Sequence, residues 1–332
     1  MPREYNFVAI GDTVTDAFIR LKNPAAHVDI DRGSREICMR FADKIPYEDV
    51  IIVPAVGNPA NAAASAARLG LKSALVTNLG EDYFGEECFQ ALKRENIATE
   101  FIQINHNKKT NYHYVLWYED DRTILIKHEK YDYKLPDIND PGWIYFSSLA
   151  EHSLPFHEVI EKYLAVRPKI KLAFQPNTFQ IKFGAKNLAG IYKRTDLFIS
   201  NKEEAERILE IGENKRDIKE LLDGIALLGP KIVVITDGPK GAYALGEGEY
   251  WFMPPYPDPK PPYERTGAGD AFSSTFTAAL ALGKTIPEAL SWAPINSMSV
   301  VQYVGAREGL LSREKLEKYL EEAPADYKPK KI

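Results

Sequence analysis

A run of small residues followed by an acid, Gly267-Ala268-Gly269-Asp270, stands near the C-terminal end of the chain, and a helical pattern continues from it to Gly283. The first N–H groups of a helix have no partner within the helix and lie at the positive end of its dipole, so residues 267–269 predict a phosphate cradle. A carboxylate beside a bound phosphate can accept the proton of an attacking hydroxyl. The stretch therefore predicts phosphoryl transfer with Asp270 as general base, although capping alone also favours Asp in a first helical turn.

Two further stretches carry groups suited to a sugar. An apolar strand pattern from 5 to 10 stops at Gly11-Asp12, and α/β proteins bind ligands at such carboxyl ends of strands. Asp12 and Asp16 could accept hydrogen bonds from neighbouring hydroxyls, whereas in the alternative interpretation Asp12 stabilises a turn and Asp16 is solvated. Gly57-Asn58-Pro59-Ala60-Asn61 opens an alanine-rich helix, and its Asn58 and Asn61 amides can both donate and accept, or serve only as helix caps.

Two other stretches have groups suited to a nucleotide and its metal. Asn201-x-x-Glu204 follows a buried strand pattern. It predicts either a capping box or a pair of oxygen ligands for a hydrated Mg²⁺. The turn from Thr236 to Gly241 contains Gly238, and its main-chain amides could line a nucleotide site, although such turns are common.

The elements that must position these residues alternate along the second half of the chain. Helical patterns separate short apolar runs, which is typical of a mainly parallel sheet covered by helices on both faces. Pro294 lies within the helical stretch 286–304 and is expected to kink or break it. The apolar runs are 144–147, 172–175, 197–200 and 232–236, and the helices between them are 156–166, 202–209 and 218–228.

Two excursions interrupt this pattern and predict a small β-sheet lid. One holds short strands around a turn at Arg32-Gly33-Ser34, and the other is a hairpin with a turn at residues 119–122. The aromatic residues of the hairpin more often fill a sheet interface than bind a ligand. We therefore predict a catalytic core of residues 1–17, 53–108 and 131–324, a lid of 18–52 and 109–130, and a solvated tail of 325–332.

Composition excludes several classes of function. The 332 residues are 45% hydrophobic and 27% charged with a net charge of −5, which argues against nucleic acid as the main partner. No apolar run is long enough to span a bilayer and the N-terminus lacks a signal-peptide pattern, so we expect a cytoplasmic protein without a membrane partner. Cys38 and Cys88 form no disulfide framework or Cys-x-x-Cys spacing, and the six histidines form no His-Glu-x-x-His pattern.

The order of these motifs, with Thr-Gly-Ala-Gly-Asp at 266–270, resembles the ribokinase-like (PfkB) family of carbohydrate and nucleoside kinases nearly end to end. The resemblance implies a three-layer αβα core with a mainly parallel sheet and a β-sheet lid, with ATP in the C-terminal half and the sugar under the lid. It assigns Asp270 as catalytic base, with Gly267, Ala268 and Gly269 as the anion hole. It also implies acceptor contacts from Asp12, Asp16, Gly57, Asn58 and Asn61, Mg²⁺ held by Asn201 and Glu204 through water, and nucleotide contacts from Thr236, Gly238, Gly241, Thr266 and Asn296.

The chain departs from the family pattern at two places. The family usually has two glycines where this chain has Val56-Gly57, which implies a narrower acceptor pocket. Glu264 and Arg265 stand where the family tends to have Asp and Thr, and the longer acid and added positive charge put its monovalent-cation site in question.

These features predict an ATP-dependent sugar kinase. A nucleoside kinase of the same fold stays open, with a base slot formed by Tyr112, Tyr114 or Trp117. A non-catalytic binding regulator is disfavoured by the intact Gly-Ala-Gly-Asp, and a dinucleotide oxidoreductase by the missing Gly-x-Gly-x-x-Gly. The sequence names neither the acceptor nor the donor among ATP, ADP and GTP, and strand edges in the lid could pair two copies into a homodimer. A phosphosugar kinase stays open as well, with a second phosphate held by one or more of Arg35, Arg40, Lys108, Lys109, Arg122 and Lys127.

Overall fold

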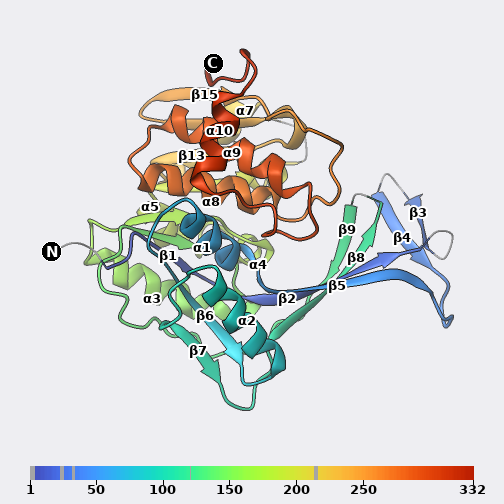
Figure 1. Cartoon of the computed structure of the whole chain (residues 1–332). Helices are drawn as coiled ribbons and strands as arrows, with labels where there is room; N and C mark the ends of the chain where they lie inside the picture. The colour runs from blue at the N-terminus through green and yellow to red at the C-terminus, as the bar shows by residue number, and fades with distance from the viewer. Residues whose placement is uncertain (1–3, 23–25, 32–33, 120, 213–215) are drawn as a thin grey trace.

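The computed structural model describes residues 4–22, 26–31, 34–119, 121–212 and 216–332 (Figure 1). The predicted turns at Arg32-Gly33 and around Asp120 fall outside these ranges. In the part described, no helix combines the length and the apolar character that crossing a bilayer would require.

The centre of the molecule is a ten-stranded, mainly parallel sheet. Its order is β16-β15-β14-β13-β12-β11-β10-β1-β6-β7, and the strands from β13 to β7 are parallel. The parallel strands are β13 (Ile232–Thr236), β12 (Leu197–Asn201), β11 (Lys171–Phe174), β10 (Trp143–Phe146), β1 (Phe7–Ile10), β6 (Ser73–Gly80) and β7 (Ile102–Asn105). The antiparallel edge consists of β14 (Ala242–Gly246), β15 (Glu249–Met253) and β16 (Lys330–Lys331).

Two hydrophobic cores lie on opposite faces of this sheet. Successive side chains of β1 point to opposite faces, so Phe7 and Ala9 belong to one core while Val8 and Ile10 belong to the other. The first core includes α1 (Asn58–Arg68), α2 (Tyr83–Arg94), α8 (Ala268–Ala281), α9 (Ile286–Val300) and α10 (Arg313–Glu321). The second includes α3 (Leu154–Ala165), α4 (Thr178–Phe183), α5 (Ala189–Arg194), α6 (Lys202–Ile208) and α7 (Ile218–Leu227). The predicted three-layer αβα architecture is confirmed.

The predicted lid is present as a second sheet that projects from the core (Figure 1). Its order is β5 (Tyr47–Val56), β2 (Val14–Leu21), β8 (Asn111–Tyr118) and β9 (Asp121–Leu125), with β2 and β8 parallel. A separate hairpin of β3 (Ala26–Asp31) and β4 (Ser34–Met39) lies at its far end. The boundaries expected at 17/18 and 52/53 fall inside β2 and β5, so two strands run without a break from core to lid.

The structure differs from the sequence prediction at three places. Helix α9 continues through Pro294, so of the predicted kink or break the break does not occur. The tail is not simply solvated, because Tyr327 is buried and donates to Ser291 O, and β16 pairs with β15. Strand β7 and helices α4 and α5 were not predicted, since their sequences are short and weakly patterned.

Candidate active site

A cavity of about 520 Å³ lies between the carboxyl ends of the central strands and the lid. The strand ends contribute Asp12, Gln175 and Thr236, while the lid contributes His113 and Arg122. Most of the predicted site residues line it: Asp12, Asp16, Gly57, Asn58, Asn61, Asn201, Glu204, Thr236, Thr266, Gly267, Gly269 and Asp270. The structure therefore brings together motifs that are up to 258 positions apart in the sequence, from Asp12 to Asp270.

A smaller cavity of about 220 Å³ adjoins the first and shares Thr236, Arg265 and Gly269 with it. Gly238, Gly241 and Ala268 line this second cavity, as expected for the nucleotide side. Its wall is largely apolar, formed by Phe272, Pro294, Met298 and Val301 among others. An apolar slot beside a polar cavity suits an aromatic base attached to phosphates.

Asn296 lines neither cavity, contrary to the expectation that it contacts the nucleotide. It is fully buried, its Nδ2 donates to Thr275 Oγ1 at 2.8 Å, and its Oδ1 accepts from Leu311 N at 2.9 Å. The cavity is instead lined by Pro294, Ser297 and Met298, which lie on another face of α9. A helix turns 3.6 residues per revolution, so a position one or two residues from the correct face points elsewhere.

The phosphate cradle begins at Gly267, the N-cap of α8, where φ is 83°. A Cβ there would lie 2.3 Å from Ala306 Cβ, so both the backbone and the packing require glycine. Gly269 differs, because a Cβ at this position would meet nothing within 4 Å and the residue lines both cavities. The main chain at the start of α8 is thus open to a ligand where the helix dipole favours an anion.

Asp270 lies in the first turn of α8 and is held by two amides. Asn61 Nδ2 donates to its Oδ2 at 2.9 Å, and Gln175 Nε2 donates to its Oδ1 at 3.3 Å. The hydroxyl of Tyr145 donates to Gln175 Oε1 and so fixes the orientation of that amide. Burial raises the pKa of Asp270, while the two amides and the charge of Arg122 oppose the rise. The carboxylate is therefore oriented at the cavity and more basic than an ordinary Asp.

The two carboxylates that the sequence predicts to bind the acceptor, those of Asp12 and Asp16, are buried, and each has a histidine neighbour. Tyr133 Oη donates to both oxygens of Asp12, at 3.0 and 2.9 Å, and His128 Nδ1 lies 3.2 Å from Asp12 Oδ2. His113 Nδ1 lies 3.5 Å from Asp16 Oδ1. These partners could not be predicted from the sequence, because His128 follows β9 in a loop and only the parallel β2–β8 register places His113 opposite Asp16.

Several buried polar atoms of this cavity have no hydrogen-bond partner among the described residues. They include Asp16 Oδ1, Asn61 Oδ1 and His113 Nε2. Buried polar groups are normally paired, so such a group of donors and acceptors is suited to a ligand with several hydroxyls.

Gly57 and Asn58 shape the same side of the cavity. Gly57 has φ 105°, and a Cβ there would lie 2.8 Å from Asp12 O, so only glycine fits. Asn58 does not cap α1 through its side chain, because its Oδ1 accepts instead from Ser148 Oγ at 3.0 Å.

Asn201 and Glu204 form a capping box and also line the main cavity. Asn201 Oδ1 accepts from Glu204 N at 2.7 Å, and Glu204 Oε2 accepts from Asn201 N at 3.0 Å. Burial raises the pKa of Glu204, and the bond from Asn201 N opposes the rise. The structural role of the pair is thus established, and its position still leaves it facing the cavity.

Glu264 is fully buried beside the cradle and ties two loops together. Its carboxylate accepts from Thr266 N at 2.8 Å, from Thr266 Oγ1 at 2.6 Å and from Gly305 N at 3.3 Å. Arg122 Nε of the lid lies 4.0 Å from Glu264 Oε1. The carboxylate is therefore engaged by the protein itself, with a cationic side chain nearby.

A model of the pfkB family of carbohydrate kinases matches residues 53–313. The chain belongs to this family. It is 26% identical over 273 residues to the ribokinase of Bacillus subtilis, covering 80% of this chain and 87% of that one. It is 29% identical over 238 residues to the cytidine kinase of Thermococcus kodakarensis, covering 70% and 82%. Among solved structures, the Arabidopsis thaliana ribokinase complexed with ribose and ATP superposes with a TM-score of 0.76 at 20% identity, covering 95% and 98%. Kinase relatives and family membership together identify this pfkB-family chain as a phosphotransferase.

Proposed function

We propose that this pfkB-family enzyme is an ATP-dependent kinase that phosphorylates a hydroxyl of a small sugar. The observation that carries the proposal is the position of Asp270, held by Asn61 and Gln175 next to the phosphate cradle and facing the cavity. A binding protein without catalysis would have no use for a basic carboxylate at this point. The relatives named ribokinase support the sugar, and the solved ribokinase with ribose and ATP supports the donor.

Different residues of the chain have different roles in the proposed reaction. The carboxylates of Asp12 and Asp16 and the Asn61 Oδ1 atom accept hydrogen bonds from the sugar hydroxyls, and Asp270 takes the proton of the reacting hydroxyl. The sugar oxygen then attacks the γ-phosphorus of ATP while the bond to the β-phosphate oxygen breaks and ADP leaves. The amides of Gly267, Ala268 and Gly269 stabilise the charge on the transferring group.

Asn201 and Glu204 would hold Mg²⁺, with water between the ion and the side chains. Carboxylate and amide oxygens suit this ion, although the capping box already uses one oxygen of each side chain, Glu204 Oε2 and Asn201 Oδ1. Bound Mg²⁺ would neutralise phosphate charge during transfer. We include no monovalent cation, because Thr266 and Gly305 already engage the Glu264 carboxylate. A kinase using ATP and a small metabolite suits the cytoplasm.

A nucleoside acceptor is the second candidate, favoured by one wall of the cavity. Ile124, Ile126 and Phe179 form an apolar side that could receive a base, and a cytidine kinase is among the relatives. The expected aromatic slot does not form, because Tyr112, Tyr114 and Trp117 are not among the residues lining the cavity. Tyr114 is half-exposed on the outer face of the lid, and the Arg20 guanidinium covers the Trp117 ring at 4.8 Å.

The case for a phosphosugar acceptor depends on Arg122. Of the basic residues that could hold a second phosphate, Arg122 is the one whose described side chain lines the cavity. Its Nε is buried and has no hydrogen-bond partner among the described residues.

A screen of ATP consumption over free sugars, sugar acids, phosphosugars and nucleosides separates the three classes of acceptor. Turnover on nucleosides alone would overturn the sugar proposal.

The role of Asp270 is tested by Asp270→Asn. General-base catalysis typically contributes about 10²–10⁴ in rate, so we expect kcat to fall at least ~100-fold with the KM for ATP nearly unchanged. Asp140→Asn, an exposed acid far from the cavity, is the matched control and should keep wild-type turnover. Wild-type kcat in Asp270→Asn would refute the assignment of the base.

A further inference from the structure

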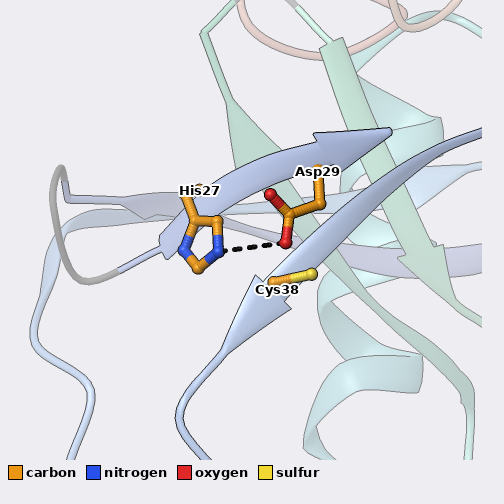
Figure 2. Close-up of side chains that lie close together, drawn as sticks. All are labelled: His27, Asp29 and Cys38. Atoms are coloured by element: carbon orange, nitrogen blue, oxygen red, sulfur yellow. Dashed lines mark ion pairs between the residues drawn. The ribbon is translucent and has the colours of Figure 1, made fainter. Parts of the chain in front are cut away.

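Three potential metal ligands gather on the hairpin at the far end of the lid. His27 and Asp29 lie on β3, and Cys38 lies on β4. His27 is directly opposite Cys38 in the antiparallel register, and Asp29 follows His27 by two residues. Residues opposite one another or two apart on a strand share a face, so all three side chains project from the same side of the ribbon (Figure 2).

The distances among the ligand atoms are close to those of a metal site. His27 Nε2 lies 3.4 Å from Asp29 Oδ2, and the ligand atoms of all three residues lie within 4.8 Å of one another. Tetrahedral Zn²⁺, with bonds of about 2.0 Å to nitrogen and oxygen and about 2.3 Å to sulfur, separates its ligand atoms by roughly 3.3–3.6 Å. The His27–Asp29 separation already fits, and the sulfur needs only a small side-chain movement.

The charge on this face also favours a cation. Asp29 is directly opposite Glu36, and like charges in opposed positions destabilise a hairpin. The exposed His27–Asp29 ion pair alone contributes little to stability, about 0–1 kcal/mol, and leaves Cys38 without a role. A bound divalent cation would engage the thiolate and offset the opposed carboxylates.

We propose that His27, Asp29 and Cys38 bind a divalent transition-metal ion of the Zn²⁺ type, with water or Glu36 completing the coordination. Imidazole, carboxylate and thiolate together select such an ion over Mg²⁺. The site is separate from the catalytic cavity, which none of the three residues lines. The ion would cross-link β3 and β4 and displace the thiol proton of Cys38.

Thiol reactivity in the full-length, metal-free protein tests the site directly. Cys88 is fully buried, so a bulky disulfide reagent applied to the folded protein reports Cys38. We expect one equivalent of Zn²⁺ to slow the reaction at least tenfold, and millimolar Mg²⁺ to leave it unchanged. His27→Gln should abolish the Zn²⁺ protection while the thiol stays reactive.

Co²⁺ provides a second readout that does not depend on activity. The wild-type protein and Cys88→Ala should both develop an intense thiolate-to-cobalt absorption band with one equivalent, and Cys38→Ser should not. The described residues that line the catalytic cavity include histidines and carboxylates but neither Cys38 nor Cys88, so binding there gives neither the band nor the protection. Equal reactivity of Cys38 with and without Zn²⁺, or a cobalt band that persists in Cys38→Ser, would overturn the proposal.

Discussion

At the scale of single residues, the site combines acids that are buried or partly buried with neutral hydrogen-bond donors that orient them. Asp270 has the amides of Asn61 and Gln175, and Asp12 has the hydroxyl of Tyr133. The acids could be predicted from the sequence because they stand next to glycines at strand and helix ends. Tyr133, Gln175 and His128 could not, because their contacts depend on where separate strands and loops meet. Asn296 lines neither cavity, because a shift of one or two positions along a helix turns a side chain to another face.

The pH dependence of turnover should report the raised pKa of Asp270. Burial raises this pKa, so the base becomes protonated at a pH above the ordinary Asp value of about 3.9. We expect kcat to decline as pH falls through that raised pKa, with the base ionised and activity complete above it. Initial rates at saturating substrates, together with thermal melts at each pH to exclude unfolding, measure the effect. Full activity down to pH 4 would contradict it.

Tyr133→Phe should weaken acceptor binding more than chemistry. The variant removes a donor shared by both oxygens of Asp12, and hydrogen bonds to charged groups contribute about 1.5–3 kcal/mol. We expect the KM for the acceptor to rise about tenfold or more while kcat changes by less than about threefold. Tyr163→Phe, which removes a hydroxyl bonded to Asn139 O, is the control. An unchanged KM in Tyr133→Phe would show that the Tyr133 hydroxyl does not prepare Asp12 for binding the acceptor.

At the scale of elements, the parts of the site that the core supplies lie where a strand ends or a helix starts, whereas the lid supplies Asp16, His113 and Arg122 from within its strands. This rule made the cradle at α8 and the Asn201–Glu204 box predictable from local sequence. The lid was predictable as a departure from the alternation of strands and helices. Its parallel pairing of β2 with β8 was not, because nothing local in either strand specifies a partner nearly a hundred residues away.

Gly269→Ala tests phosphate binding at the start of α8 without a change in stability. An added methyl group meets nothing in the protein within 4 Å but enters the space shared by the two cavities. We therefore expect an unchanged melting temperature and a fall in kcat/KM for ATP of at least about tenfold, since close approach of phosphate to the main chain is blocked. Gly267→Ala should instead lower the melting temperature, because its methyl group collides with Ala306. Wild-type kinetics in Gly269→Ala would place the phosphate elsewhere.

At the scale of the whole molecule, the outer face of the lid bears a partly exposed apolar row, in which Ala17 is buried. The strand registers place Ile52, Ala17, Tyr114 and Leu125 in one row across the sheet. Ile52, Tyr114 and Leu125 are 53%, 49% and 52% exposed, whereas His113 and Ile124 on the other face line the cavity. The sequence predicts that two copies pair through strand edges of the lid, whereas the exposed apolar side chains favour pairing through this face.

We propose that two copies pack their lids together through this row. Light scattering should give a dimer for the wild-type protein and a monomer for Ile52→Lys, because a charge in an apolar interface is costly. Ile104→Lys on β7 places the same charge at an exposed position on the edge of the central sheet, and it should leave the dimer intact. A monomeric wild-type protein at micromolar concentration would refute the proposal.

Strand β2 links the two acids that we propose bind the acceptor. Asp12 is held by Tyr133 just before the strand, whereas Asp16 belongs to the strand, which continues into the lid. In the proposed mechanism, a sugar that bridged both acids would therefore bind the core and the lid at once. Nucleotide alone would make no such bridge, so attack of water on ATP would be disfavoured until an acceptor is bound.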